Sequence, residues 1–173
     1  MKTKKIRLVS CHLGAGCSIT AIKDGKSIDT SMGFTPLEGV VMSTRSGSID
    51  PGIIIYLMKK FNAKKINKML NEDSGLKGIS GMQDMRDLMK SGKNGAKLAI
   101  EVFCYSIAKQ IAAYASALGG IDAIAFTGGI GENEARIRKK ILNQLKFLKA
   151  KVFVIRANEK EIILKEALDL LSK

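Results

Sequence analysis

The stretch from Thr127 to Asn133 reads T-G-G-I-G-E-N. An apolar run, Ile121–Phe126, precedes it, and a helical pattern, Glu134–Leu148, follows it. Three glycines therefore stand in a strand-to-helix turn, where backbone N–H groups can approach a ligand because no Cβ intervenes. The N-terminus of the next helix, with Glu132 or Asn133 as its expected cap, adds unpaired N–H groups and a positive dipole end. This order of elements favours a nucleotide or another anion.

A tight corner between a strand and a helix is the alternative interpretation, because glycine-rich turns also occur without a ligand. Two specific nucleotide motifs are excluded. The dinucleotide pattern G-x-G-x-x-G fails because Asn133 and Glu134 stand near the place of its last glycine. A phosphate loop of the Walker type needs Gly-Lys-Ser or Gly-Lys-Thr, which does not follow here.

The composition fits one domain, or two small lobes, with an aliphatic core. The chain has 173 residues, of which 46% are hydrophobic and 5% aromatic, and it contains no Trp. No run reaches the roughly 18 apolar residues that a membrane span needs. The apolar stretch after the basic start, Met1–Lys5, is too short for a signal peptide. We therefore expect a cytoplasmic protein with no membrane partner.

The formal net charge of +13 favours anionic partners. Many lysines are spread over predicted helix faces, as in Lys59, Lys60, Lys64, Lys65 and Lys68. Single-strand binders combine such charge with aromatic platforms, and this chain is poor in aromatic residues. Solvated helix faces are therefore favoured over nucleic-acid binding, and an acidic partner stays open as an alternative.

The cysteines and the single histidine argue against a metal centre of thiolate and imidazole ligands. Cys11, Cys17 and Cys104 are odd in number and form no C-x-x-C pair, so buried thiols are expected. His12 stands alone and cannot form a histidine-rich metal site.

Hydrophobic patterning predicts strands first and helices later. Asp24-Gly25 predicts a two-residue hairpin turn, and Asp50 and Pro51 predict a helix start. The predicted strands are Ile6–Cys11, Ser18–Ile22, Ser27–Ser31, Ile121–Phe126 and Lys151–Arg156. The predicted helices are Pro51–Phe61, Ala63–Asn71, Gln83–Lys90, Ala96–Leu118, Glu134–Leu148 and Asn158–Leu171, with loops at Met32–Ile49 and Asp73–Met82.

The order β-β-β-α…β-α-β-α indicates an α/β fold with a mixed sheet. An antiparallel meander extended by parallel βα units is the pattern of the ribonuclease-H-like lobe in actin-like ATPases. In such a lobe a glycine-rich hairpin holds phosphates, and a later strand-to-helix turn holds the nucleoside. Gly14–Gly16 and Gly128–Gly131 stand at the two corresponding places.

Several segments match family motifs in unbroken order over nearly the whole chain. They are His12–Ser18, Asp29–Gly39, Thr44–Pro51, Ser74–Gly81, Asp84–Asp87 and Phe126–Asn133. The first three resemble H-L-G-N-G-x-S, D-T-S-M-G-F-T-P-L-E-G and T-R-S-G-D-I-D-P of the acetate kinases and related short-chain acyl kinases. The chain is thus identified as a member of that family.

The resemblance implies a phosphotransferase that converts ATP and acetate, or propionate or butyrate, to ADP and the acyl phosphate with Mg²⁺. Family members are about twice as long, so residues 1–173 resemble a single C-terminal nucleotide-binding lobe without its N-terminal lobe. Such a chain is expected to be inactive alone. The alternatives are a non-catalytic remnant, a dimerisation module, or one subunit of a split acyl kinase.

Site roles follow from the resemblance residue by residue. His12 would steady the transferring phosphoryl group, and Arg45 would bind the acyl carboxylate or phosphate; both are catalytic candidates. Glu159 would lie near magnesium. The nucleotide-binding candidates are His12, Gly14, Ala15, Gly16, Asp84, Met85, Arg86, Gly128, Gly129, Ile130, Gly131, Glu132 and Asn133. Without the resemblance, Arg45 would be taken as a solvent-facing loop residue and His12 as a turn histidine.

The resemblance also implies partner chains, and the sequence differs from the family motifs at three positions. A homodimer through this lobe is expected, with the small-residue helix Ala96–Leu118 as a candidate face, and a separate N-terminal half is a further candidate partner. Ala15 stands where the family usually has Asn, and Ser48 where it usually has Asp. Lys160 replaces a second acid beside Glu159, which places a positive charge next to the expected magnesium ligand.

Overall fold

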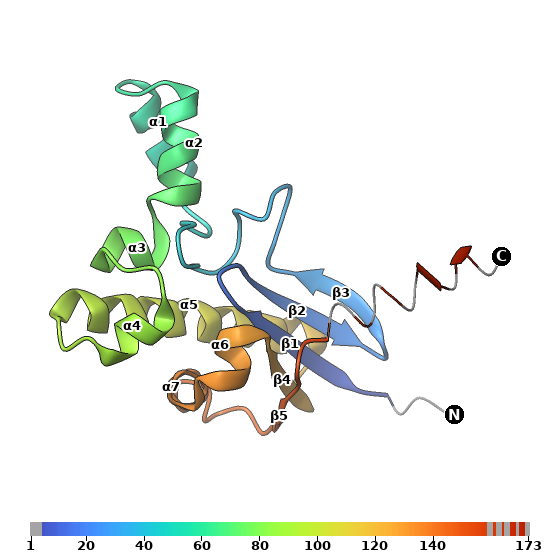
Figure 1. Ribbon diagram of the computed structural model, residues 1–173. Coiled ribbons are helices and arrows are strands. Elements are labelled where there is room, and N and C mark those ends of the chain that lie inside the picture. Colours follow the sequence, from blue (N-terminus) through green and yellow to red (C-terminus); the bar gives the residue numbers. More distant parts are fainter. Residues whose placement is uncertain (1–4, 159–160, 162–163, 165–166, 169, 172–173) are drawn as a thin grey trace.

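The structure is a computed structural model that describes residues 5–158, 161, 164, 167–168 and 170–171 (Figure 1). A five-stranded sheet with the order β3-β2-β1-β4-β5 forms its centre. The strands are β1 (Arg7–Leu13), β2 (Cys17–Lys23), β3 (Lys26–Thr30), β4 (Ala123–Thr127) and β5 (Lys151–Val154). β1, β2 and β3 pair antiparallel, and β4 pairs parallel with β1 and β5. The predicted mixed sheet is confirmed.

The hairpin between β2 and β3 follows from its two turn residues. Asp24 and Gly25 have φ values of 52° and 83°. Two successive positive φ values are what the tight turns of two-residue hairpins require. The Asp24 side chain also accepts a hydrogen bond from the backbone N–H of Ile6. The sequence prediction of this turn is confirmed.

Seven helices lie between Pro51 and Asn143. They are α1 (Pro51–Met58), α2 (Ala63–Glu72), α3 (Gly75–Ser80), α4 (Met85–Lys90), α5 (Asn94–Leu118), α6 (Gly128–Asn133) and α7 (Ala135–Asn143). Asp50 caps α1 with Pro51 at its first position, and Asn62 caps α2. Gly119 ends α5 in the left-handed conformation. None of these helices combines the length and hydropathy that crossing a bilayer requires.

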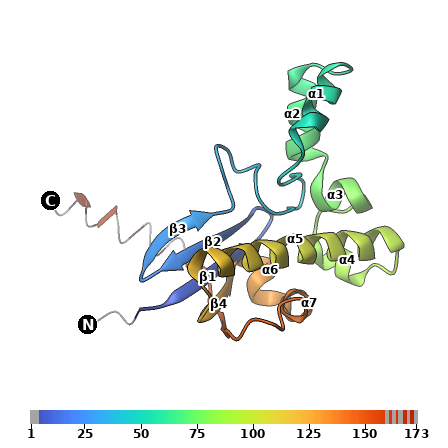
Figure 2. The same cartoon turned by 180° about the vertical axis from the view of Figure 1, so that it is seen from behind.

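The hydrophobic core lies between one face of the sheet and helices α5 and α7. Val9, Cys11 and Ile19 of the sheet, with Phe103 and Ile107 of α5, are fully buried there. Figure 1 shows α5 behind the strands, and Figure 2 shows it in front of them from the other side. The apolar side of α5 is therefore used within the chain, and the expectation that this helix offers a dimer face is wrong for that side.

Two local predictions differ from the structure because tertiary contacts decide them. The expected loop Asp73–Met82 contains helix α3, whose first N–H groups bond to the 42–45 loop: Ser74 to Thr44 O, Leu76 to Met42 O and Lys77 to Ser43 O. Gly75 has φ +61°, and a Cβ there would lie 2.2 Å from Met42 O. No periodicity signal in the sequence reveals such contacts.

The helix after β4 also begins earlier than predicted. It starts at Gly128 as α6, and a second helix, α7, follows from Ala135. Glu132 and Asn133 therefore do not occupy the N-cap of α7, which is Glu134. The Glu132 carboxylate accepts from the Gly128 N–H at the start of α6, and the Asn133 amide donates to Gly129 O within α6. Part of the predicted final helix, Asn158–Leu171, lies outside the described residues, as do Glu159 and Lys160.

Gly75→Ala is expected to destabilise the fold by at least about 2 kcal/mol, because the new Cβ meets a carbonyl in a left-handed conformation. Gly81→Ala is the matched control. Gly81 has φ +77°, but nothing lies within 4 Å of a Cβ there. Only backbone strain of about 1 kcal/mol then applies. Urea denaturation measures both; equal losses would contradict the role of the Gly75 contact.

Candidate functional site

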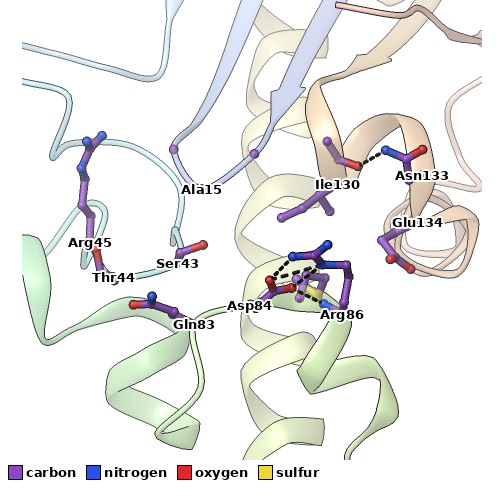
Figure 3. A pocket seen from close by; sticks show the side chains of 14 residues that line it. Ala15, Ser43, Thr44, Arg45, Gln83, Asp84, Arg86, Ile130, Asn133 and Glu134 are labelled. Atoms are coloured by element: carbon purple, nitrogen blue, oxygen red, sulfur yellow. Dashed lines mark hydrogen bonds and ion pairs between the residues drawn. The ribbon is translucent and has the colours of Figure 1, made fainter.

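A cleft of about 620 Å³ opens at the carboxyl ends of β1 and β4 (Figure 3). Four segments line it: the β1–β2 turn, the loop before α1, the start of α4, and α6 with the start of α7. The lining residues are Gly14, Ala15, Gly16, Ser43, Thr44, Arg45, Gln83, Asp84, Met85, Arg86, Gly129, Ile130, Asn133 and Glu134. Figure 3 shows Asp84 and Arg86 between Ser43–Arg45 on one side and Ile130–Glu134 on the other.

The β1–β2 turn is held close to the loop that carries Arg45. The Gly14 N–H donates to Gly16 O at 3.0 Å inside the turn, and the Ser43 N–H donates to Ala15 O at 3.2 Å. A Cβ at Gly16 would lie 3.4 Å from Nη1 of Arg45, so the missing side chain lets the guanidinium approach the backbone. The turn and the guanidinium form one continuous wall of the cleft.

Arg45 is oriented by main-chain contacts. Its Nη1 donates to Pro36 O at 3.3 Å, and its own carbonyl accepts from the Met42 N–H at 3.2 Å. Among the residues that the structure describes, no carboxylate lies within ion-pair distance of Arg45. A guanidinium without a carboxylate partner keeps its fork of N–H donors available for a carboxylate or phosphate.

Asp84 and Arg86 form an ion pair at the mouth of the cleft. Arg86 Nη2 lies 2.6 Å from Asp84 Oδ2, and Arg86 Nε lies 3.0 Å from Asp84 Oδ1. Asp84 also caps α4 by accepting from the Arg86 backbone N–H at 2.8 Å. The side-chain hydrogen bond from Arg86 is the main reason that the pKa of Asp84 is lowered to about 2. The Asp84 carboxylate is therefore ionised and held in place at neutral pH.

Helix α6 forms the opposite wall, and its first two glycines have different surroundings. Gly128 has φ +78°, and a Cβ there would lie 2.8 Å from Leu13 O, so close packing against β1 requires glycine. Gly129 is exposed, and nothing lies within 4 Å of a Cβ built on it. Arg138 of α7 donates to the carbonyls of Gly131 and Glu132, which satisfies the end of α6.

Most of the predicted site residues meet in this cleft. Gly14, Ala15, Gly16, Arg45, Asp84, Met85, Arg86, Gly129, Ile130 and Asn133 all line it. His12 is half-buried near the end of β1, with Nε2 about 4.0 Å from a Cβ placed at Gly14, so it lies beside the cleft. Glu159 falls outside the described residues.

Three predicted residues support the cleft from behind. Gly128 and Gly131 are buried. Glu132 Oε1 accepts from the Gly128 N–H at 3.0 Å and from the Ala157 N–H at 2.7 Å. Its carboxylate thus joins the start of α6 to the segment after β5. This contact gives Glu132 a structural position rather than a place in the lining.

Four lining residues were missed in the sequence: Ser43, Thr44, Gln83 and Glu134. Each lies one or two positions from a predicted site residue, so extending the predicted set along the sequence by that much would have found them. Glu134 also acts on Arg86 electrostatically, since its negative charge contributes to the raised pKa of that guanidinium.

The described residues do not form a metal centre by themselves. No group of three or more His, Cys, Asp or Glu side chains with ligand geometry occurs among them. Asp84 is neutralised by Arg86, and Glu132 is used by two backbone N–H groups. Glu134 is then the carboxylate of the lining with which a cation could interact. Mg²⁺ in kinase sites is held largely by substrate phosphates with one or two carboxylates, so this donor set fits Mg²⁺ carried in by a nucleotide.

The three cysteines are buried and free, as predicted. Burial raises the pKa of Cys11, and it raises those of Cys17 and Cys104 to about 12. All three thiols therefore stay protonated at neutral pH and take no part in the chemistry of the cleft.

Comparisons with known proteins agree on one family. The sequence model of the acetokinase family matches residues 1–166. The acetate kinase of Carboxydothermus hydrogenoformans is 45% identical over 96% of this chain and 49% of its own length. The chain spans about half the length of the curated relatives it matches.

Solved structures show the same fold. The acetate kinase of Entamoeba histolytica superimposes with a TM-score of 0.92 at 32% identity, over 98% of this chain and 53% of that one. A propionate kinase of Francisella tularensis superimposes with a TM-score of 0.84 at 45% identity, over 90% of this chain and 47% of that one. The fold is thus the ribonuclease-H-like α/β lobe expected from the sequence.

Arg86→Ala is expected to raise the pKa of Asp84 from about 2 part of the way to its ordinary value of about 3.9, because the strongest hydrogen bond to the carboxylate is removed. The backbone N–H of residue 86 still donates to Asp84 in this variant, so the pKa of Asp84 does not return fully to its ordinary value. Carboxyl ¹³C shifts followed over pH measure the change. Lys90→Ala is the control, since Lys90 is the smallest of the causes and should move the pKa little. If the pKa of Asp84 is unchanged in Arg86→Ala, the Arg86 side chain is not the main cause of the lowered pKa.

Proposed function

The chain belongs to the acetokinase family, and we propose from this premise that it is the nucleotide-binding lobe of an acetate kinase-type phosphotransferase. The complete enzyme would transfer the γ-phosphoryl group of ATP to a short carboxylate, giving ADP and an acyl phosphate. Acetate is the proposed acceptor, with propionate as the alternative, because both kinds of kinase occur among the similar structures.

The observation that carries the proposal is the cleft itself. Its lining brings together segments as far apart in sequence as Gly14 and Asn133 at the carboxyl edge of the sheet. Ligands of open α/β sheets are typically bound outside the carboxyl ends of the strands. A cavity of about 620 Å³ is within the size range of small-molecule sites.

The proposed phosphate end of the cleft is the β1–β2 turn with Arg45. Phosphoryl transfer depends mainly on positioning and on neutralising charge. Backbone N–H groups at a glycine-rich turn and an unpaired guanidinium supply both. His12, beside the turn, would steady the phosphoryl group, and Mg²⁺ bound with the nucleotide would neutralise charge on the phosphates.

The proposed nucleoside end lies between α4 and α6. Ile130 offers an apolar surface, and Gly129 leaves space without a side chain. Arg86, fixed by Asp84, places a planar cation at this end. Guanidinium planes stack on aromatic rings, so the base of the nucleotide would lie between Arg86 and Ile130.

Gly129→Val is expected to weaken Mg·ADP binding at least about tenfold without loss of fold, because Gly129 lines the cleft and a Cβ there has no protein atom within 4 Å. Gly92→Val is the matched control. Nothing lies within 4 Å of a Cβ at Gly92 either, and this residue does not line the cleft. Calorimetric titration measures both affinities; micromolar binding is expected for the unmodified chain. Equal affinity of the two variants would argue against this nucleotide site.

The purified chain alone is expected to show no turnover that depends on both acetate and ATP. Catalytic groups that act together lose most of their rate enhancement when some of them are removed. This chain leaves about half of the matched relative's length uncovered. A coupled assay for ADP release tests this. Acetate-dependent turnover would show that the lobe is catalytically sufficient, whereas Mg·ADP binding without turnover is the expected result.

A non-catalytic dimerising module is the second candidate. Helix α1 has no buried residue and exposes large apolar side chains, namely Ile53, Ile55, Tyr56 and Met58. The proposed homodimer would therefore use α1 in place of the buried side of α5. The cytoplasmic location and the absence of nucleic-acid and membrane partners remain part of the proposal.

A further inference from the structure

The charged side chains of the cleft are unevenly distributed between its two ends. Among the lining residues, the charged ones are Arg45, Asp84, Arg86 and Glu134. Arg45 stands at the phosphate end, where no carboxylate of the described residues lies within ion-pair distance. Asp84 and Arg86 neutralise each other, so Glu134 leaves the nucleoside end net negative in a chain of net charge +13. Figure 3 shows Arg45 and Glu134 on opposite sides of the Asp84–Arg86 pair.

The backbone of Glu134 is fixed beside Ile130 of the nucleoside end. Its N–H donates to Ile130 O at 3.0 Å, and its carbonyl accepts from the N–H groups of Ile137 at 3.0 Å and Arg138 at 3.2 Å. Main-chain bonds therefore join the end of α6 to the first turn of α7 at this residue. The Glu134 side chain takes no part in the junction, because it makes no capping hydrogen bond to α7.

The Glu134 carboxylate is half-buried and has no ion-pair partner in the ranges that the structure describes. It lies near Arg86 without contacting it. The pKa of Arg86 is raised mainly by the hydrogen bond to Asp84, and the charges of Asp87 and Glu134 add to that shift. A half-buried carboxylate has lost part of its hydration, so a hydrogen bond that a ligand donates to it is stronger than at an exposed site.

The chemistry of a carboxylate restricts what it can bind in the cleft. An ionised carboxylate only accepts hydrogen bonds, so it repels phosphate groups and favours an N–H or O–H donor. A nucleoside carries such donors in its ribose hydroxyl groups and in the exocyclic amino group of a base such as adenine. We propose that Glu134 determines specificity at the nucleoside end, where its carboxylate accepts a hydrogen bond from one of these donors and keeps phosphate groups at the Arg45 end. This inference rests on the proposed nucleotide site.

Mg²⁺ is the other partner that a carboxylate can take. In the proposed arrangement the metal accompanies the phosphates, which lie at the turn with Arg45. Glu134 lies instead near Arg86, and the positive charge of a guanidinium opposes a second cation nearby. A neutral donor of the nucleoside is therefore the partner to which the proposal commits.

Calorimetric titration of the full chain with Mg·ADP tests the proposal. Glu134→Gln should weaken binding about five- to tenfold, because a neutral acceptor replaces a charged one at nearly unchanged size. Asp87→Asn is the matched control and should bind like the unmodified chain. Asp87 also acts on the charge of Arg86, but it is exposed and does not line the cleft. Mg·pyrophosphate, which has no nucleoside, should bind Glu134→Gln at least as tightly as it binds the unmodified chain.

Two analogues of ADP identify the donor. 2′,3′-Dideoxy-ADP lacks both ribose hydroxyl groups, and inosine diphosphate lacks the exocyclic amino group. The unmodified chain should bind the analogue without the donor about five- to tenfold more weakly than ADP. Glu134→Ala should lose most of that discrimination, because the analogue and the variant remove the same hydrogen bond.

The outcomes separate this inference from the proposed function. Equal Mg·ADP affinity of Glu134→Gln and Asp87→Asn overturns the inference and leaves the nucleotide site in place, as does full discrimination against both analogues in Glu134→Ala. A loss of affinity in Glu134→Gln that disappears when ADP is titrated without Mg²⁺ also overturns it, by assigning the carboxylate to the cation. If the unmodified chain does not bind Mg·ADP, the proposed function fails and the inference fails with it.

Discussion

Parallel pairing of β1 with β4 is the constraint on which the rest of the structure depends. It places His12 beside Thr127, so that the turn after β1 and helix α6 after β4 start from the same edge of the sheet. At the opposite end, Arg7 Nη2 lies 2.6 Å from Asp122 Oδ1, and the Arg7 backbone N–H donates to Asp122 Oδ2 at 2.8 Å. The side-chain hydrogen bond from Arg7 is the main reason that the pKa of Asp122 is lowered to about 2, so this ion pair is charged at neutral pH.

Local signals were sufficient for the parts of the fold that depend on a few neighbouring residues. Asp24-Gly25 predicted its hairpin, and Asp50-Pro51 predicted the start of α1, because each forms its hydrogen bonds within two or three positions. Helix α3 was missed because its first N–H groups bond to a loop some thirty residues earlier, which Gly75 alone permits. Motif resemblance located most of the cleft, and Gln83 and Glu134 lie one position outside the residues that it identified.

The helix N-termini near the cleft show why a sequence motif alone does not define an anion site. The N–H groups at the start of α3 bond to the 42–45 loop, and the Gly128 N–H of α6 bonds to Glu132. These donors are already satisfied within the protein. Arg45 differs from these donors, because no carboxylate of the described residues lies within ion-pair distance of its guanidinium, which Pro36 O orients.

The buried core explains how the walls of the cleft are held within this chain. The core lies mainly on the α5 side, where Phe103, Ile107 and Ile137 are buried. On the other face of the sheet, Ala123 and Ala125 of β4 are also buried. The walls of the cleft are attached to that core where Leu13 ends β1, where Met85 begins α4 and where Gly128 begins α6, because all three residues are buried. His12 is half-buried one residue before Leu13, and its side chain lies beside the turn that lines the cleft. The core therefore fixes the position of His12 relative to the cleft.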